Sequence, residues 1–172
     1  NTGWDGCSGY RDCDSTLLGF SHTHLSGTGQ TDFGDFMITP VNGKIPFAKE
    51  DETASPGYYS VTTKDFMVEL TALQRTGCHR YTFYGNTERQ LIIDLRYNIG
   101  ETRPSQFSFE TVSDRVIEGG RHVCGWAQDR WIFFSAEFSV PFTECKALGE
   151  DRYLMTFPDD TKEITVCMGL SP

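Results

Sequence analysis

Apolar and polar side chains alternate with a period of two along most of the chain. Phe134, Ala136 and Phe138 alternate with the polar residues Ser135 and Glu137. Side chains of a strand point alternately to opposite faces, so this spacing predicts a strand with one buried face. Similar alternation recurs in three further stretches, at residues 68–72, 80–84 and 164–168. No stretch carries a long helical period, and we therefore expect an all-β protein.

Residues typical of turns separate these alternating runs. The turn candidates are Asn42-Gly43, Ser55-Pro56-Gly57, Gly85-Asn86, Gly119-Gly120 and Pro158-Asp159-Asp160. Their spacing is typical of an antiparallel β-sandwich, for which we expect about ten or eleven strands. Trp131 lies in a strongly apolar run and is expected in the core. The length of 172 residues fits one domain.

The segment from residue 19 to residue 29 breaks this pattern, because it is rich in Gly, Ser and His and too polar for a core strand. Such loops often carry function. If the segment is extended, His22 and His24 share one face, which would suit a metal site. The third ligand would then come from Asp32, Asp35, His79 or His122. The alternative is that the two imidazoles make hydrogen bonds to a substrate or within the loop.

The charge of the chain excludes two classes of partner. A net charge of −9 without a basic cluster argues against nucleic acid and against an anionic membrane surface. The longest apolar stretches, such as Leu91-Ile92-Ile93, are too short for membrane insertion. A neutral substrate such as a sugar is compatible with this charge.

Cysteines and carboxylates give no catalytic or zinc signature. The six cysteines include no C-x-x-C pair, and their even number allows up to three disulfides. Several fall in apolar strand patterns, so we favour their interpretation as buried free thiols. No pair of carboxylates has the apolar surroundings that would raise the pKa of one member, as a glycosidase acid requires. Asp32 and Asp35 are instead expected to fix the glycine-rich loop by Asx-type hydrogen bonds. Trp4 and Trp126 lie in glycine-flanked stretches, where a tryptophan belongs either to the core or to a platform that stacks on a sugar ring.

Several stretches, taken in order, resemble glycoside hydrolase family 92, the calcium-dependent exo-acting α-mannosidases. The matching stretches are Gly3-Trp4-Asp5-Gly6-Cys7-Ser8-Gly9-Tyr10, residues 19–29 (GFSHTHLSGTG), Ala54-Ser55-Pro56-Gly57-Tyr58-Tyr59, His79-Arg80-Tyr81-Thr82-Phe83, Gly125-Trp126-Ala127 and Phe138-Ser139-Val140-Pro141-Phe142. Together they span nearly the whole chain.

The resemblance implies the N-terminal β-sandwich of an inverting two-domain enzyme. The general acid, the general base and most of the calcium site would come from an (α/α)₆ helical domain that this chain lacks. The sandwich would supply part of the pocket for the terminal mannose of a glycan. Residues 1–172 are then expected to form a single non-catalytic domain, incomplete at its N-terminal edge, in a secreted, periplasmic or cell-surface protein.

The resemblance also implies which residues contribute to that pocket. They are Trp4, Asp5, His22, His24, Cys124 and Trp126. Trp4 would stack on the sugar, and the polar groups would fix its hydroxyls. The alternative function is a free-standing carbohydrate-binding β-sandwich with no enzyme attached.

Overall fold

The computed structural model describes residues 13–24, 33–41, 43–99, 102–125 and 127–172. These residues form fifteen strands, one 3-10 helix and no α-helix. In chain order they are β1 (Thr16–Leu17), β2 (Phe20–His22), β3 (Asp35–Thr39), β4 (Ile45–Pro46), η1 (Lys49–Asp51), β5 (Glu52–Ser55), β6 (Tyr58–Thr62), β7 (Phe66–Ala72), β8 (Thr76–Phe83), β9 (Gln90–Asp94), β10 (Ser105–Thr111), β11 (Val116–Val123), β12 (Arg130–Phe138), β13 (Glu144–Gly149), β14 (Arg152–Thr156) and β15 (Glu163–Ser171). Over these ranges, no helix is long and apolar enough to cross a membrane.

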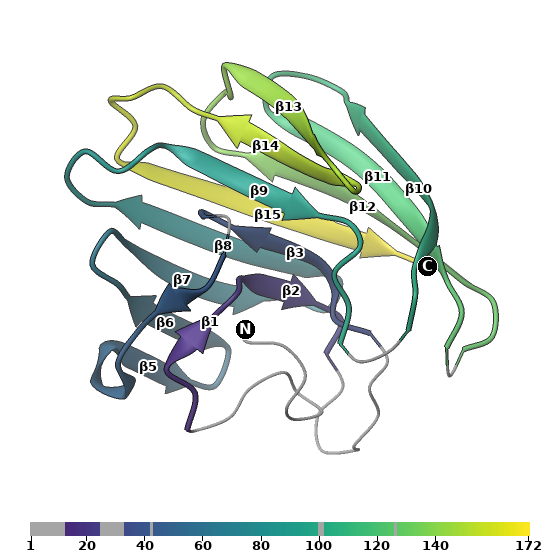
Figure 1. The fold of residues 1–172 in the computed structure, drawn as a ribbon, viewed down its shortest axis with the longest axis horizontal. Coiled ribbons are helices and arrows are strands. Elements are labelled where there is room, and N and C mark those ends of the chain that lie inside the picture. The colour runs from purple at the N-terminus through teal and green to yellow at the C-terminus, as the bar shows by residue number, and fades with distance from the viewer. Residues whose placement is uncertain (1–12, 25–32, 42, 100–101, 126) are drawn as a thin grey trace.

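Two antiparallel sheets form the two layers of a sandwich. The larger sheet has the order β10-β11-β12-β15-β8-β7-β6-β5, and the smaller one has the order β13-β14-β9-β3-β2. Figure 1 shows the smaller sheet in front of the larger one. The prediction of an antiparallel β-sandwich is confirmed. The strand number exceeds the expectation because β1, β2 and β4 are too short to show an alternating pattern.

The core lies between the two sheets. Phe134, Ala136 and Phe138 on β12 are buried, as their alternation predicted. Phe36 on β3 packs against Phe134, with ring centroids 4.8 Å apart. Each buried side chain of this size contributes roughly 1.5–3 kcal/mol through the area it removes from water. The facing strands are therefore held together mainly by the apolar side chains that the period of two selects.

Trp131 was expected in the core and lies outside it, with 40% of its surface exposed. It shares the outer face of β12 with Phe133, which is 44% exposed. The strand around Trp131 carries large side chains on both faces, so an apolar run there does not show which face is buried. Gly119 and Gly120 are also not a turn but part of β11. A Cβ on Gly120 would come within 2.4 Å of Phe133 Cδ1, so glycine makes room for that ring.

The interpretation of the cysteines as buried free thiols is wrong. Cys78 and Cys167 form a disulfide between directly opposed positions of β8 and β15. Cys13 and Cys124 are exposed free thiols, and Cys145 is half-buried. The sequence conceals the bridge because 89 residues separate its two cysteines. The sixth cysteine lies outside the described residues.

Candidate functional site

His22 ends β2 and is buried, with 7% of its surface exposed. The segment that begins at Gly19 was expected to be too polar for a core strand, but Phe20 and His22 point into the sandwich while Ser21 points outward. Burial lowers the pKa of His22, so its imidazole is neutral at pH 7. His22 Nδ1 donates to the Phe36 carbonyl at 3.1 Å, which leaves Nε2 as an acceptor. One hydrogen bond to the backbone thus satisfies one ring nitrogen of this buried histidine.

His22 and His24 do not share a face, because Thr23 between them has a positive φ of 54°. His24 is exposed and turns back, with Nε2 at 3.0 Å from the Ser21 carbonyl. The geometry on which the metal alternative depended is therefore absent. Across the described part of the chain, no group of three or more His, Cys, Asp or Glu side chains could hold a metal ion.

His79 on β8 stacks on His22, with ring centroids 5.0 Å apart and planes 6° from parallel. The Tyr81 hydroxyl donates to His79 Nδ1 at 3.0 Å. Burial, together with the neighbouring His22, holds the pKa of His79 well below its ordinary value. A Cβ on Gly77 would lie 2.9 Å from His22 Nε2, so the absence of a side chain there makes room for the imidazole. His22 Nε2 has no hydrogen-bond partner among the described residues.

A buried ion cluster lies beside this histidine pair. Arg130 Nη1 and Nη2 each donate to the Asp35 carboxylate at 2.8 Å, in a bidentate pair. Arg121 donates to the same carboxylate and also, at 2.6 Å, to the Leu95 and Tyr97 carbonyls. Asp35 and Arg121 are wholly buried, and the Arg130 side chain is 13% exposed. Paired charges of this kind are tolerated inside a protein because each charge has a partner. Arg121 Nε and Arg130 Nε are buried without a hydrogen-bond partner among the described residues.

The cluster assigns Asp35 a role other than the expected Asx turn. Burial alone would raise the pKa of Asp35, but the hydrogen bonds from Arg130 and the positive charges of Arg121 and Arg130 outweigh it and lower that pKa. Asp35 is therefore an ionised anchor, unsuited to act as a general acid. Thr23 Oγ1 bonds the same carboxylate and accepts from the Asp35 backbone N–H at 3.1 Å. The carboxylate thus joins the segment around Thr23 to the strand that begins at Arg130.

The backbone around the cluster adopts conformations that non-glycine residues rarely take. Thr23, Phe33 and Phe36 have φ values of 54°, 80° and 52°. The register of β2 on β3 also shifts between Ser21 and His22. Bulges and left-handed residues persist only where surrounding contacts over-determine them, and they concentrate at functional sites.

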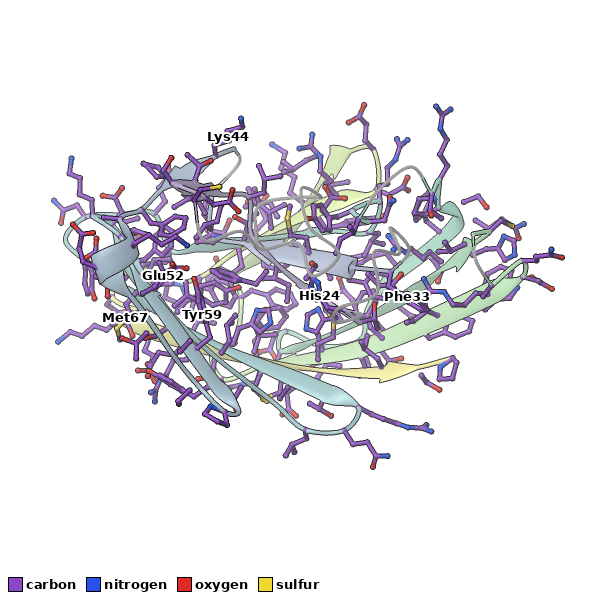
Figure 2. The ribbon with its side chains drawn as sticks, turned by 90° about the horizontal axis from the view of Figure 1, so that it is seen from below. His24, Phe33, Lys44, Glu52, Tyr59 and Met67 are labelled. Atoms are coloured by element: carbon purple, nitrogen blue, oxygen red, sulfur yellow. A yellow bond between two sulfur atoms is a disulfide. The ribbon has the colours of Figure 1, made fainter. Side chains whose placement is uncertain are left out.

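An open groove of about 730 Å³ runs along this region. His22, Thr23, His24 and Arg130 line it together with side chains of β6, β7 and β8. Figure 2 shows His24 and Phe33, which come from the two chain segments that meet at the Asp35 cluster. The groove therefore offers the edge of a guanidinium on Arg130, whereas His22 lines the groove with its acceptor Nε2 buried.

The structure brings only some of the predicted site residues together. His22 and His24 line the groove, whereas Cys124 is exposed and is not among the described residues that line it. Cys124 Sγ lies 3.9 Å from the His122 ring nitrogens. Trp4, Asp5 and Trp126 lie outside the described residues, so their part in the site stays a prediction.

Asp35, Arg121 and Arg130 were not recognised from the sequence as one cluster. Their separations of 86 and 95 residues leave no local spacing to detect. One feature of the sequence does point to the cluster: Asp35 follows a glycine at the start of an apolar strand, and a charged side chain that is buried there needs a partner.

Comparison with known proteins identifies the family. The profile described as the glycosyl hydrolase family 92 N-terminal domain matches residues 1–171, and the chain belongs to this family. No curated protein sequence matches the chain.

Solved structures similar to the chain include the family GH92 alpha-mannosidase BT3965 from Bacteroides thetaiotaomicron in complex with mannoimidazole, at 26% identity and a TM-score of 0.84. The GH92 glycosyl hydrolase ccman5 has 26% identity and a TM-score of 0.82. The inverting mannosidase BT2199 from Bacteroides thetaiotaomicron has 25% identity and a TM-score of 0.78. Each comparison covers 99% of this chain, but only 28%, 28% and 26% of the respective structures. The chain thus spans little more than a quarter of their length.

Proposed function

We propose that this chain is the non-catalytic N-terminal domain of an inverting α-mannosidase that acts on mannose-containing glycans. The observation that carries the proposal is the family match over residues 1–171. In this proposal a helical domain of the same polypeptide supplies the general acid and the general base. The sandwich supplies part of the pocket for the terminal mannose, and the protein works in a secreted, periplasmic or cell-surface setting.

The groove suits recognition of sugar hydroxyls. His22 Nε2 is buried, unpartnered among the described residues and neutral, so it can accept a hydrogen bond from a hydroxyl. Its other nitrogen is committed to Phe36, which fixes the ring orientation. Asp35 acts as a positioning residue, because its carboxylate holds both the Thr23 segment and the start of β12. Trp4, Asp5, His24, Cys124 and Trp126 complete the proposed pocket.

Calcium is proposed to bind in the parent enzyme, mostly through residues of the helical domain. The described residues of this chain offer no cluster of three or more acidic, His or Cys ligands. Hard cations such as Ca²⁺ take six to eight oxygen ligands. The described part of the chain therefore does not fit a calcium site by itself, and its proposed contribution is to bind and orient the sugar.

The first experiment measures release of mannose from 4-nitrophenyl α-mannoside. The isolated 172-residue chain should show no turnover, whereas a polypeptide that continues beyond Pro172 into a helical domain should hydrolyse the substrate with inversion, followed by NMR. Turnover by the purified isolated chain would contradict the non-catalytic role. A coding sequence beyond Pro172 without a helical domain would favour the free-standing binding module instead.

The second experiment changes His22 to Asn in the two-domain polypeptide. Asparagine keeps a short N–H donor toward the Phe36 carbonyl but removes the acceptor Nε2 of the imidazole. Loss of one hydrogen bond to substrate should lower kcat/KM by about tenfold. Asp159→Asn, at an exposed turn, is the control. A folded His22→Asn variant with kcat/KM within twofold of the parent would remove His22 from the pocket.

A further inference from the structure

The outer face of the eight-stranded sheet carries two parallel aromatic rings, neither of which lines the groove. Trp131 and Phe133 lie two residues apart on β12, with ring centroids 6.0 Å apart and planes 8° from parallel. They are 40% and 44% exposed. The five-stranded sheet covers the opposite face of β12 (Figure 1). We call this pair the outer aromatic platform.

The platform is held in place by its neighbours on β11. Gly120 lies directly opposite Phe133, and its missing side chain lets the Phe133 ring approach the backbone. His122 lies opposite Trp131, with ring centroids 5.0 Å apart. His122 Nε2 in turn contacts the Asp129 carboxylate at 2.7 Å. The exposed rings are therefore pre-organised, which lowers the entropy cost of binding a ligand.

Polar groups border the platform. A hollow of about 410 Å³ beside Phe133 is lined by Glu118, Ser135 and Gly169. Arg75, Thr76, Leu170 and Ser171 also line this hollow and border the groove as well. A second hollow of about 310 Å³, which Phe133 and Glu118 also line, adds Ser108 and Glu110. The small side chains of glycine and serine leave room in these hollows. Carboxylates and hydroxyls therefore lie beside the apolar ring of Phe133.

We propose that the outer aromatic platform is a second glycan-binding site, which takes a neutral glycan through stacking of pyranose rings on Trp131 and Phe133. The apolar face of a sugar ring matches an aromatic ring, and the sugar hydroxyls match the bordering Glu118 and Ser135. The net charge of −9 disfavours anionic polysaccharides and leaves neutral glycans as the ligand class. The platform holds a polymer while the groove receives a chain end.

The choice of α-mannan as the first ligand rests on the proposed function, but the platform itself does not. The platform uses the outer face of β11, β12 and β15, whereas His22 lies on β2 of the other sheet. The two proposals can therefore fail separately.

The test is electrophoresis of the 172-residue chain through native gels that contain soluble α-mannan, dextran or a mixed-linkage β-glucan. The parent chain should be retarded by α-mannan. Trp131→Ala should weaken retardation by about tenfold, the size expected for loss of one aromatic contact. Trp131→Phe should stay within about threefold of the parent, and Tyr84→Ala, which removes a 37% exposed tyrosine elsewhere, should not differ from it. Circular dichroism checks that each variant is folded.

Retardation by another neutral glycan with the same dependence on Trp131 keeps the platform and removes mannan as its ligand. Retardation that persists in the Trp131→Ala/Phe133→Ala double variant, or no retardation by any of the three glycans, overturns the proposal. Loss of retardation in His22→Asn but not in Trp131→Ala would assign mannan binding to the groove and also overturn the platform. In the two-domain polypeptide, Trp131→Ala should leave kcat/KM for 4-nitrophenyl α-mannoside unchanged.

Discussion

Replacing Asp35 with Asn should destabilise the protein more than any surface substitution of a carboxylate. The change removes the negative charge that two guanidiniums share, while both remain inside the fold: Arg121 is wholly buried and the Arg130 side chain is 13% exposed. Stranding a buried charge by removing its partner costs about 3–5 kcal/mol. For a domain of this size, that corresponds to a fall in Tm of roughly 6–20 °C.

Urea unfolding at pH 7 measures the effect, with Asp159→Asn as an exposed control that should change the free energy of unfolding by less than about 0.5 kcal/mol. Adding Arg130→Met to Asp35→Asn should recover part of the loss, because both terminal nitrogens of Arg130 donate to Asp35 and its removal takes away one stranded charge. A loss below about 1 kcal/mol for Asp35→Asn, or no recovery in the double variant, would refute the argument that Asp35 stabilises the fold by pairing with the two guanidiniums.

The same substitution should change the response to acid. The pKa of Asp35 is lowered in the fold, so its contribution is complete above the unfolded pKa of about 3.9 and is lost as the pH falls through the lower folded value. The parent should therefore lose stability below about pH 4 more steeply than Asp35→Asn. Parallel curves for the two proteins between pH 4 and pH 2 would contradict this.

Three further predictions concern the elements around the groove. Burial lowers the pKa of His22 and His79, so the unfolded chain takes up protons first and stability should fall as the pH drops below about 6.5, by at most about 1.4 kcal/mol per pH unit for each histidine. In His79→Phe the urea midpoint should therefore depend less on pH than in the parent, and superposable curves for the two proteins would count against this. Gly77→Ala should cost about 1–3 kcal/mol in urea unfolding, because its Cβ would lie 2.8 Å from a carbon of the His22 ring; an unchanged midpoint would mean that the ring moves freely. The double variant Cys78→Ser/Cys167→Ser should lose about 2–5 kcal/mol of unfolding free energy relative to the oxidised parent. The parent after reduction should unfold at the same urea concentration as the double variant.

The period of two was sufficient to predict the strands whose faces differ in polarity. Phe134, Ala136 and Phe138 belong to such a strand, and their burial follows from local alternation. Trp131 and Phe133 belong to the same strand, but both of its faces carry large apolar side chains there. Where both faces are apolar, alternation gives no direction, and the core assignment of Trp131 was wrong.

The contacts that build the candidate site were beyond local pattern reading. Cys78 and Cys167 pair because β8 and β15 are neighbours, and only the sheet order shows this. Asp35 and Arg130 meet across 95 residues for a similar reason. The histidine motif is visible in the sequence, but its conformation is not, because the left-handed Thr23 turns His24 away from His22.

The position of β15 has a consequence for vectorial synthesis on the ribosome. β15 emerges after all the other described strands, yet it lies between β12 and β8 and separates strands β10–β12 from strands β5–β8. Until Glu163–Ser171 is available, the edges of β8 and β12 that will receive it have no permanent partner. At roughly 5–20 residues per second, the 79 residues between Phe83 and Glu163 leave the edge of β8 open for about 4–16 seconds. The 24 residues between Phe138 and Glu163 leave the edge of β12 open for about 1–5 seconds. Open strand edges are templates for pairing with other chains, so the nascent protein should depend on chaperone protection during these intervals.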